Sequence, residues 1–278
     1  MIKLLSANFL RLRKNNAFWG SMGVSLGMGL LMVVDSWRSA QESGGAWAST
    51  VDAELFKYAA FIGILAAELI PLFLGTEYSD GAIRNKMVVG HSRLSIYFAN
   101  LITGYTACLL CSVAYILGCV ALGVPLLGWF TQPPALLLTA LAGSLLMAAA
   151  FCAIFTFVAM NCAKKSTSVV ICLLGAFAAF IGAIVIHSML DAPEFIQGYE
   201  LSMGGQVVSA PLEPNPNYLT GAKREVYQFL YDLLPTGQSL QYTMLSFTDP
   251  ARLMGLAAAV TVVFTGAGAA LFRRKDLK

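Results

Sequence analysis

One acidic residue, Glu68, lies inside a long apolar stretch, in the sequence L-A-A-E-L-I-P-L. An ionised acid at the middle of a bilayer costs roughly 3 kcal/mol on insertion scales, so such a group normally faces a bundle interior or a wet cavity. Pro71 follows in the next turn, where it frees a backbone carbonyl and allows the helix to bend. Two interpretations are open for Glu68. It lines a substrate path or joins two helices, or it is a protonated, hydrogen-bonded structural acid.

Groups that carry out enzyme chemistry are scarce in this sequence. The two histidines, His91 and His187, are far apart, and no Walker A, H-E-x-x-H or G-x-S-x-G motif is present. Cys108 and Cys111 form a C-x-x-C pair, but they lie in an apolar stretch without a second pair or a nearby histidine, which favours packing over metal binding. We therefore expect no catalytic residue, no metal site and no cofactor bound by this chain.

The connection at residues 76–96 combines acids, bases and an apolar face, in the sequence T-E-Y-S-D-G-A-I-R-N-K-M-V-V-G-H-S-R-L-S-I. Ile83, Met87 and, beyond Gly90, Leu94 fall on one side of a predicted helix. A simple turn between two spans does not need a segment of this length and composition, so we expect a polar partner to dock on it. The alternative is a solvated hairpin.

Six apolar spans must position these residues. They lie at about residues 18–34, 58–75, 97–121, 135–163, 167–188 and 252–272. Each span reaches or approaches the roughly 20 residues that a helix needs to cross about 30 Å of hydrocarbon. With 58% hydrophobic and 12% charged residues, the chain is too apolar for an ordinary soluble domain. We expect an all-α membrane protein with one transmembrane domain over residues 1–278. In its first span, Gly23 and Gly27 form a G-x-x-x-G pattern that allows close helix approach.

The charged residues are sorted between the connections. With a cytoplasmic N-terminus, one side carries 13 of the 18 basic residues against three acids, and the other side carries five basic residues and 11 acids. Because an excess of Lys and Arg marks cytoplasmic loops, we expect a multi-pass cell-membrane protein with both termini and residues 76–96 inside. The basic residues then face anionic lipid headgroups, and nucleic acid is not an expected partner.

The N-terminal segment, residues 1–16, has helical periodicity. Ile2, Leu5, Phe9 and Leu12 recur at three- and four-residue steps, with basic residues at other angles. This pattern predicts a short interfacial helix with its apolar side in lipid, and a disordered basic tail is the alternative.

The connection at residues 189–251 is the longest one and is expected outside the cell. Its first half is rich in proline and glycine, which predicts turns. An amphipathic helix follows and is expected to stop at Pro235. We expect a small, partly ordered extracellular cap.

The chain resembles the integral-membrane permease subunits of type-2 ABC exporters, in the branch that contains drug, bacteriocin-immunity and sodium exporters. The resemblance covers the whole chain and includes the run P-L-F-x-G-x-E-Y-x-x-G-x-I-R-N-K at residues 71–86, its continuation G-x-S-R-x-x-I-Y at 90–97, and the basic tail F-R-R-K-D. In that family the connection between spans two and three forms a coupling helix that sits in a groove on the ATP-binding subunit. The resemblance implies that this element contains, or is flanked by, Glu77, Gly81, Arg84, Asn85, Lys86, Gly90 and Arg93. The family pattern often has Thr where this chain has Ala82.

The resemblance implies a permease subunit of an ATP-driven exporter. Two copies, or two related chains, enclose the path, and a separate dimeric ATP-binding cassette subunit holds ATP and Mg²⁺; an antimicrobial peptide or a drug is the implied substrate. The alternative is a secondary transporter that uses Glu68 as a proton or cation carrier, but no internal repeat relates residues 1–121 to 135–278. An intramembrane enzyme is disfavoured because no paired nucleophile and base are present.

Overall fold

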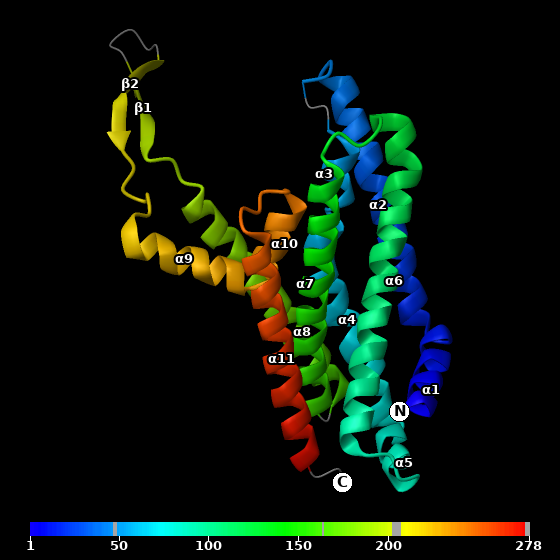
Figure 1. Ribbon diagram of the computed structural model, residues 1–278. Coiled ribbons are helices and arrows are strands. Elements are labelled where there is room, and N and C mark those ends of the chain that lie inside the picture. The colour runs from blue at the N-terminus through cyan, green and yellow to red at the C-terminus, as the bar shows by residue number, and fades with distance from the viewer. Residues whose placement is uncertain (47–48, 163, 202–206, 276–278) are drawn as a thin grey trace.

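A computed structural model of the chain describes residues 1–46, 49–162, 164–201 and 207–275 (Figure 1). In chain order its elements are α1 (Ile2–Arg13), α2 (Asn16–Glu42), α3 (Val51–Leu55), α4 (Tyr58–Ser79), α5 (Ala82–Val88), α6 (Arg93–Leu127), α7 (Pro134–Asn161), α8 (Lys165–Leu190), β1 (Phe195–Leu201), β2 (Val207–Pro214), α9 (Gly221–Leu233), α10 (Pro235–Thr243) and α11 (Pro250–Arg274). Six helical segments of the described chain are long and apolar enough to cross a membrane, namely α2, α3 with α4, α6, α7, α8 and α11. The predicted helical architecture with six spans is therefore confirmed, apart from one short hairpin.

The long helices run alongside one another, and α4 is the central one. In Figure 1, α2 lies alongside α6, and α11 lies alongside α7. α4 contacts α6, α7 and α8. In the segment of α3 and α4, 61% of the most apolar stretch is buried, compared with 17% in α8. Because α4 is enclosed on several sides, its polar residues enter the interior of the bundle.

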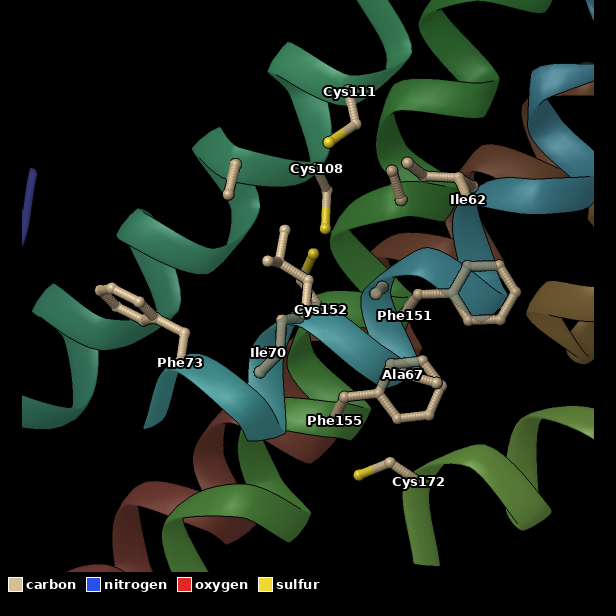
Figure 2. Packing of buried hydrophobic residues seen from close by; sticks show 14 of the residues in the cluster. Ile62, Ala67, Ile70, Phe73, Cys108, Cys111, Phe151, Cys152, Phe155 and Cys172 are labelled. Atoms are coloured by element: carbon tan, nitrogen blue, oxygen red, sulfur yellow. The ribbon is translucent and has the colours of Figure 1, made fainter. Parts of the chain in front are cut away.

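The core between α4, α6 and α7 is built from aromatic rings, small side chains and thiols. The rings of Phe151 and Phe155 stack with their centroids 6.1 Å apart, and Figure 2 shows both rings beside α4. The thiols of Cys108 and Cys152 point toward each other (Figure 2), and all six cysteines of the chain are free. Cys108 and Cys111 are both 1% exposed, which supports the packing interpretation of this pair.

The close approach between α2 and α6 depends on two glycines that lie outside the G-x-x-x-G pattern of Gly23 and Gly27. A Cβ atom on Gly23 or Gly27 would meet nothing within 4 Å among the described residues. A Cβ atom on Gly29 would overlap the backbone carbonyl of Tyr115, and one on Gly118 would overlap a backbone carbonyl of α2. Among the described residues, the close approach of α2 to α6 therefore occurs at Gly29 and Gly118, whereas the face of Gly23 and Gly27 is open.

The connection at residues 189–251 contains more regular structure than the sequence predicts. β1 and β2 form an antiparallel hairpin where turns are expected, and α9 is the predicted amphipathic helix. α9 ends at Leu233, just before Pro235, as predicted. The sequence analysis did not predict a further helix, but Pro235 starts α10, at a position where its missing N–H is not needed. α10 is buried and contacts α4, α7, α8 and α9. Several of its polar side chains find partners there; Gln238, for example, donates to the Asp232 carbonyl at 2.7 Å.

α1 is the helix predicted near the N-terminus, and the structure shows in addition that one of its faces packs on the bundle. Leu4, Asn8 and Leu12 are buried, and α1 contacts α6. Ile2 and Phe9, which belong to the predicted apolar side, are 83% and 37% exposed. The buried face includes Asn8 because this side chain has polar partners on α5 and α6. Contact of α1 with a membrane surface stays a prediction.

The N-terminus, α5 and the last turn of α11 lie at one end of the bundle, which we call the terminal end (Figure 1). The hairpin of β1 and β2 lies at the opposite end. The charge distribution predicts this division of the segments between two sides. Which side faces the cytoplasm stays a prediction.

Candidate functional site

A buried carboxylate, Glu77, lies at the terminal end, near the last residue of α4. Its side chain is 0% exposed. One carboxylate oxygen, Oε1, accepts ion-pair hydrogen bonds from Arg11 and Lys86. The other oxygen, Oε2, accepts from the Asn100 side-chain amide at 2.8 Å. Glu77 therefore joins α1, α4, α5 and α6 at one point, and we call this group, with Asn8, the Glu77 junction.

Asn8 closes the Glu77 junction from α1. Its amide nitrogen donates to Asn100 Oδ1 at 2.7 Å, and its Oδ1 accepts from Lys86 Nζ at 2.9 Å. Arg11 also donates to the Phe73 carbonyl at 3.2 Å and lies over the Phe73 ring, 3.9 Å from the centroid. The polar face of α1 thus has a partner on each of three other helices.

The electrostatics of the junction follow from its burial. Burial lowers the pKa of the Lys86 ammonium, and the neighbouring Glu77 carboxylate acts in the opposite direction. Removing one partner from a buried ion pair costs about 3–5 kcal/mol, because a charge is left without compensation. The arrangement is therefore suited to holding elements together rather than to reacting with a substrate.

Two glycine turns bring α5 back toward α4. Gly81 precedes α5 with φ of 67°, and Gly90 follows it with φ of 92°, a left-handed region that other residues seldom adopt. Ser92 then caps α6, its hydroxyl oxygen accepting from the Ser95 N–H at 3.2 Å. The tight turn at Gly81 returns the chain so that Lys86 reaches Glu77.

The face of α5 that points away from the bundle is exposed and mixed in character. Ile83 is buried at 2% exposure and anchors α5 to the core. Arg84 and Asn85 are exposed. Val88 and Val89 are exposed by 80% and 76%, among the most exposed large apolar residues of the described chain. α5 therefore offers two valines beside a polar face at the tip of the terminal end.

Arg93 and the end of α11 form a second connection at this end. Arg93 Nη1 donates to the backbone carbonyls of Phe272, Arg273 and Lys275, the second at 2.9 Å. These carbonyls belong to the last turn and the C-cap of α11, where a helix leaves carbonyl groups without an i+4 donor, so the guanidinium serves as a C-terminal cap.

Lys275 continues this connection toward α7. It donates to the Met160 carbonyl at 3.1 Å, and burial lowers its pKa. Its ammonium also lies 4.5 Å from the centroid of the Tyr78 ring. Through Arg93 and Lys275, the end of α11 contacts the start of α6 and the ends of α4 and α7.

The structure thus divides the residues predicted for this segment into two groups. Glu77, Lys86 and Arg93 point inward and are bonded within the chain, whereas Arg84 and Asn85 point outward. Their roles in coupling stay predictions.

Sequence reasoning missed Asn8, Arg11 and Asn100 as members of the junction. One signal was available, because Asn100 is a polar residue inside a predicted apolar span. The contacts that Asn8 and Arg11 make from α1 join residues 66 to 92 positions apart, which no local pattern encodes.

Glu68 lies apart from this junction. Its half-buried side chain lines a cavity between α2, α4 and α6 together with Ser25 and Cys111. The structure therefore supports a location at a cavity and does not show a hydrogen-bonded structural acid. In the described part of the chain, no group of three or more His, Cys, Asp or Glu side chains is placed to hold a metal ion.

Six apolar spans, of which α4 is the buried central one, define a multi-pass membrane protein. Residues 4–189, from α1 to the end of α8, match the family described as ABC-2 family transporter protein. The chain belongs to this family and is the permease type of component of an ABC transporter. No curated protein matches the chain.

Proposed function

We propose that this chain is the permease subunit of an ATP-driven exporter, with residues 1–278 as one permease domain, and that α5 docks on a separate ATP-binding subunit. The observation that carries the proposal is the exposure of Val88 and Val89 at the tip of an anchored helix. Each is mostly exposed, and both lie outside the six segments that are long and apolar enough to cross a membrane. Burying apolar surface against a partner gains about 25 cal/mol per Å², so a protein groove is the natural cover.

The anchoring of α5 makes it suitable for transmission. Ile83 is buried and Lys86 is paired with Glu77. Through the Glu77 junction, α5 is therefore fixed to α1, α4 and α6. A displacement of α5 by a partner is expected to move these helices with it. In this proposal Arg84 and Asn85 contact the ATP-binding subunit, Gly81 and Gly90 form the turns, and Glu77, Lys86 and Arg93 hold the segment in place.

The remaining parts of the proposal concern partners and orientation. ATP and Mg²⁺ are bound by a dimer of the partner subunit, and ATP binding shifts the permease between inward- and outward-facing states. A second copy or a related permease completes the path. Both termini and α5 are cytoplasmic, because the terminal end carries the excess of Lys and Arg. A drug or an antimicrobial peptide is the proposed substrate, in line with the exporter branch that the chain resembles.

Affinity purification of the full chain from its native membrane tests the docking. We expect an ATP-binding chain with a Walker A motif to co-purify and to hydrolyse ATP. Arg84→Glu is expected to weaken this association by about 1–3 kcal/mol, the scale of a charge-assisted contact. Val88→Asp is expected to weaken it by a similar amount, because it places a charge in an apolar contact. Neither variant is expected to lower membrane levels. Arg13→Glu is the matched control, because Arg13 is an exposed arginine at the same end of the bundle but on α1.

Normal co-purification and export by both α5 variants would exclude α5 as the docking element. Export that persists without any ATP-binding chain and follows an ion gradient would favour the secondary transporter instead. Cysteine labelling gives the orientation, since labelling of a single cysteine at position 85 from outside intact cells would contradict a cytoplasmic α5.

A further inference from the structure

A cavity of about 270 Å³ lies between α2, α4 and α6, away from the Glu77 junction. Its wall is mostly apolar and includes Met28, Phe61 and Leu65. Val24 also lines it and is 58% exposed, so the cavity is reachable from the outer side of α2. Glu68 is the one charged side chain among its described lining residues.

The carboxylate of Glu68 has no hydrogen-bond or ion-pair partner within the described chain, although hydroxyl groups line the same cavity. Those hydroxyls are already used. Ser25 donates to the Ser21 carbonyl at 2.9 Å, and Ser112 donates to the Cys108 carbonyl at 3.1 Å.

The two tyrosines of the cavity are used in the same way. Tyr115 donates to the Glu54 carbonyl at 3.2 Å. Tyr58 bonds to the Ser144 hydroxyl at 2.5 Å, and because Ser144 itself donates to the Leu141 carbonyl at 2.8 Å, the proton of that bond comes from Tyr58. The cavity wall therefore offers a ligand the carboxylate of Glu68 as an acceptor, whereas the hydroxyl groups of the wall donate to other groups of the protein.

An unpaired carboxylate in an apolar wall selects for one chemistry. A charged acceptor removed from water needs a donor, and the strongest donor is itself a cation. The apolar wall and the ring of Phe61 suit a hydrocarbon or aromatic body, and aromatic faces also attract cations. The cavity volume is slightly below the range of about 300–1,000 Å³ for drug-sized ligands, which fits a small molecule or one end of a larger one.

We infer that this cavity binds a protonated primary amine with an aromatic or alkyl body, with the ammonium at Glu68 and the body against Met28, Phe61 and Leu65. The inference deepens the proposed function, on which it rests, by giving the chemical class of the transported molecule. Entry from the side of Val24 suits such an amphipathic cation, which partitions into the membrane interface.

Binding of 4-phenylbutylamine to the purified full chain in detergent tests the inference, with 4-phenylbutan-1-ol as the neutral comparator of the same length. Isothermal titration calorimetry measures both affinities without ATP or a partner subunit. We expect the amine to bind about 10- to 100-fold more tightly than the alcohol, the range expected for a hydrogen bond to a charged group. Glu68→Gln is expected to remove this preference and to leave the affinity for the alcohol unchanged.

Two further variants make the test specific. Asp35→Asn also removes one negative charge, but from an exposed residue in the C-terminal part of α2. This variant is expected to keep the preference for the amine. Leu65→Trp fills the cavity without touching the carboxylate and is expected to abolish binding of both probes, which keeps the test decisive if Glu68→Gln folds poorly.

Equal affinity for amine and alcohol would overturn the inference and leave an apolar crevice that lipid or detergent fills. A preference for the amine that survives in Glu68→Gln would also overturn it. Both results would leave the docking of α5 untouched, because that is measured by co-purification of the ATP-binding chain. Conversely, failure of Arg84→Glu to affect co-purification would not change the binding measured here.

Discussion

Two glutamates on the same helix have opposite environments. Glu77, near the end of α4, is fully buried and bonded to two cations and an amide. Glu68, nine residues earlier on α4, is half-buried beside a cavity and has no partner among the described residues. A buried acid that is fully paired connects elements of the fold, whereas an unpaired acid at a cavity is available to form an ion pair or hydrogen bonds with a ligand. The same side chain therefore serves assembly at one position and recognition at the other.

The largest expected difference between the two is in stability. Glu77→Gln leaves the guanidinium of Arg11 and the ammonium of Lys86 without their counter-charge, and should lower the free energy of unfolding by about 3–5 kcal/mol. Glu68→Gln removes no contact within the chain and should change it by less than about 1 kcal/mol. Thermal unfolding of both variants in the same detergent measures the difference, and equal losses would show that the contrast is wrong.

A double-mutant cycle on the two cations sharpens the description of Glu77. Arg11→Met and Lys86→Met should each cost about 1–3 kcal/mol, with the smaller loss at Arg11, whose side chain is 31% exposed against 15% for Lys86. Because both bind Oε1, the second removal should cost more than the first, since it leaves Glu77 buried without any cation. Additive losses would mean that the two cations act independently.

Supplying a partner to Glu68 should make it resemble Glu77. Met28→Lys places an ammonium on the wall of the same cavity, within the space that the amine is proposed to occupy. An ammonium inside a span costs roughly 3 kcal/mol on insertion scales. The new ion pair with Glu68 offsets part of this cost, so the expected net loss of stability is about 1–2 kcal/mol. Binding of 4-phenylbutylamine should nevertheless be lost, as measured by calorimetry, and retention of amine binding would show that the ligand lies elsewhere.

Several features could be predicted from local sequence. The six spans follow from the number of consecutive apolar residues that cross a bilayer, and α5 and α9 follow from their periodicity. The division of the segments between two ends of the bundle follows from the sorted charges. Each of these features depends on neighbours within a few turns, which is the range over which hydrophobic patterns act.

The features that the sequence did not indicate depend on contacts between distant residues. Only the fold decided that Glu77 and Lys86 turn inward, because their partners Arg11 and Asn8 come from α1. The same holds for α10, whose polar sequence suggests a surface until its partners are known.

By itself, then, the sequence determined a six-span membrane protein of the ABC-2 type with a helical segment between its second and third spans. The tertiary structure decided which charges are used inside the protein and which remain available. The physical reason is that a membrane span is defined by the hydrophobicity of neighbouring residues along the chain. The pairing of a buried charge, in contrast, depends on helices that meet only after folding. Glu68 and Glu77 cannot be distinguished by residue type, and only the surroundings that folding brings to each of them separate their roles.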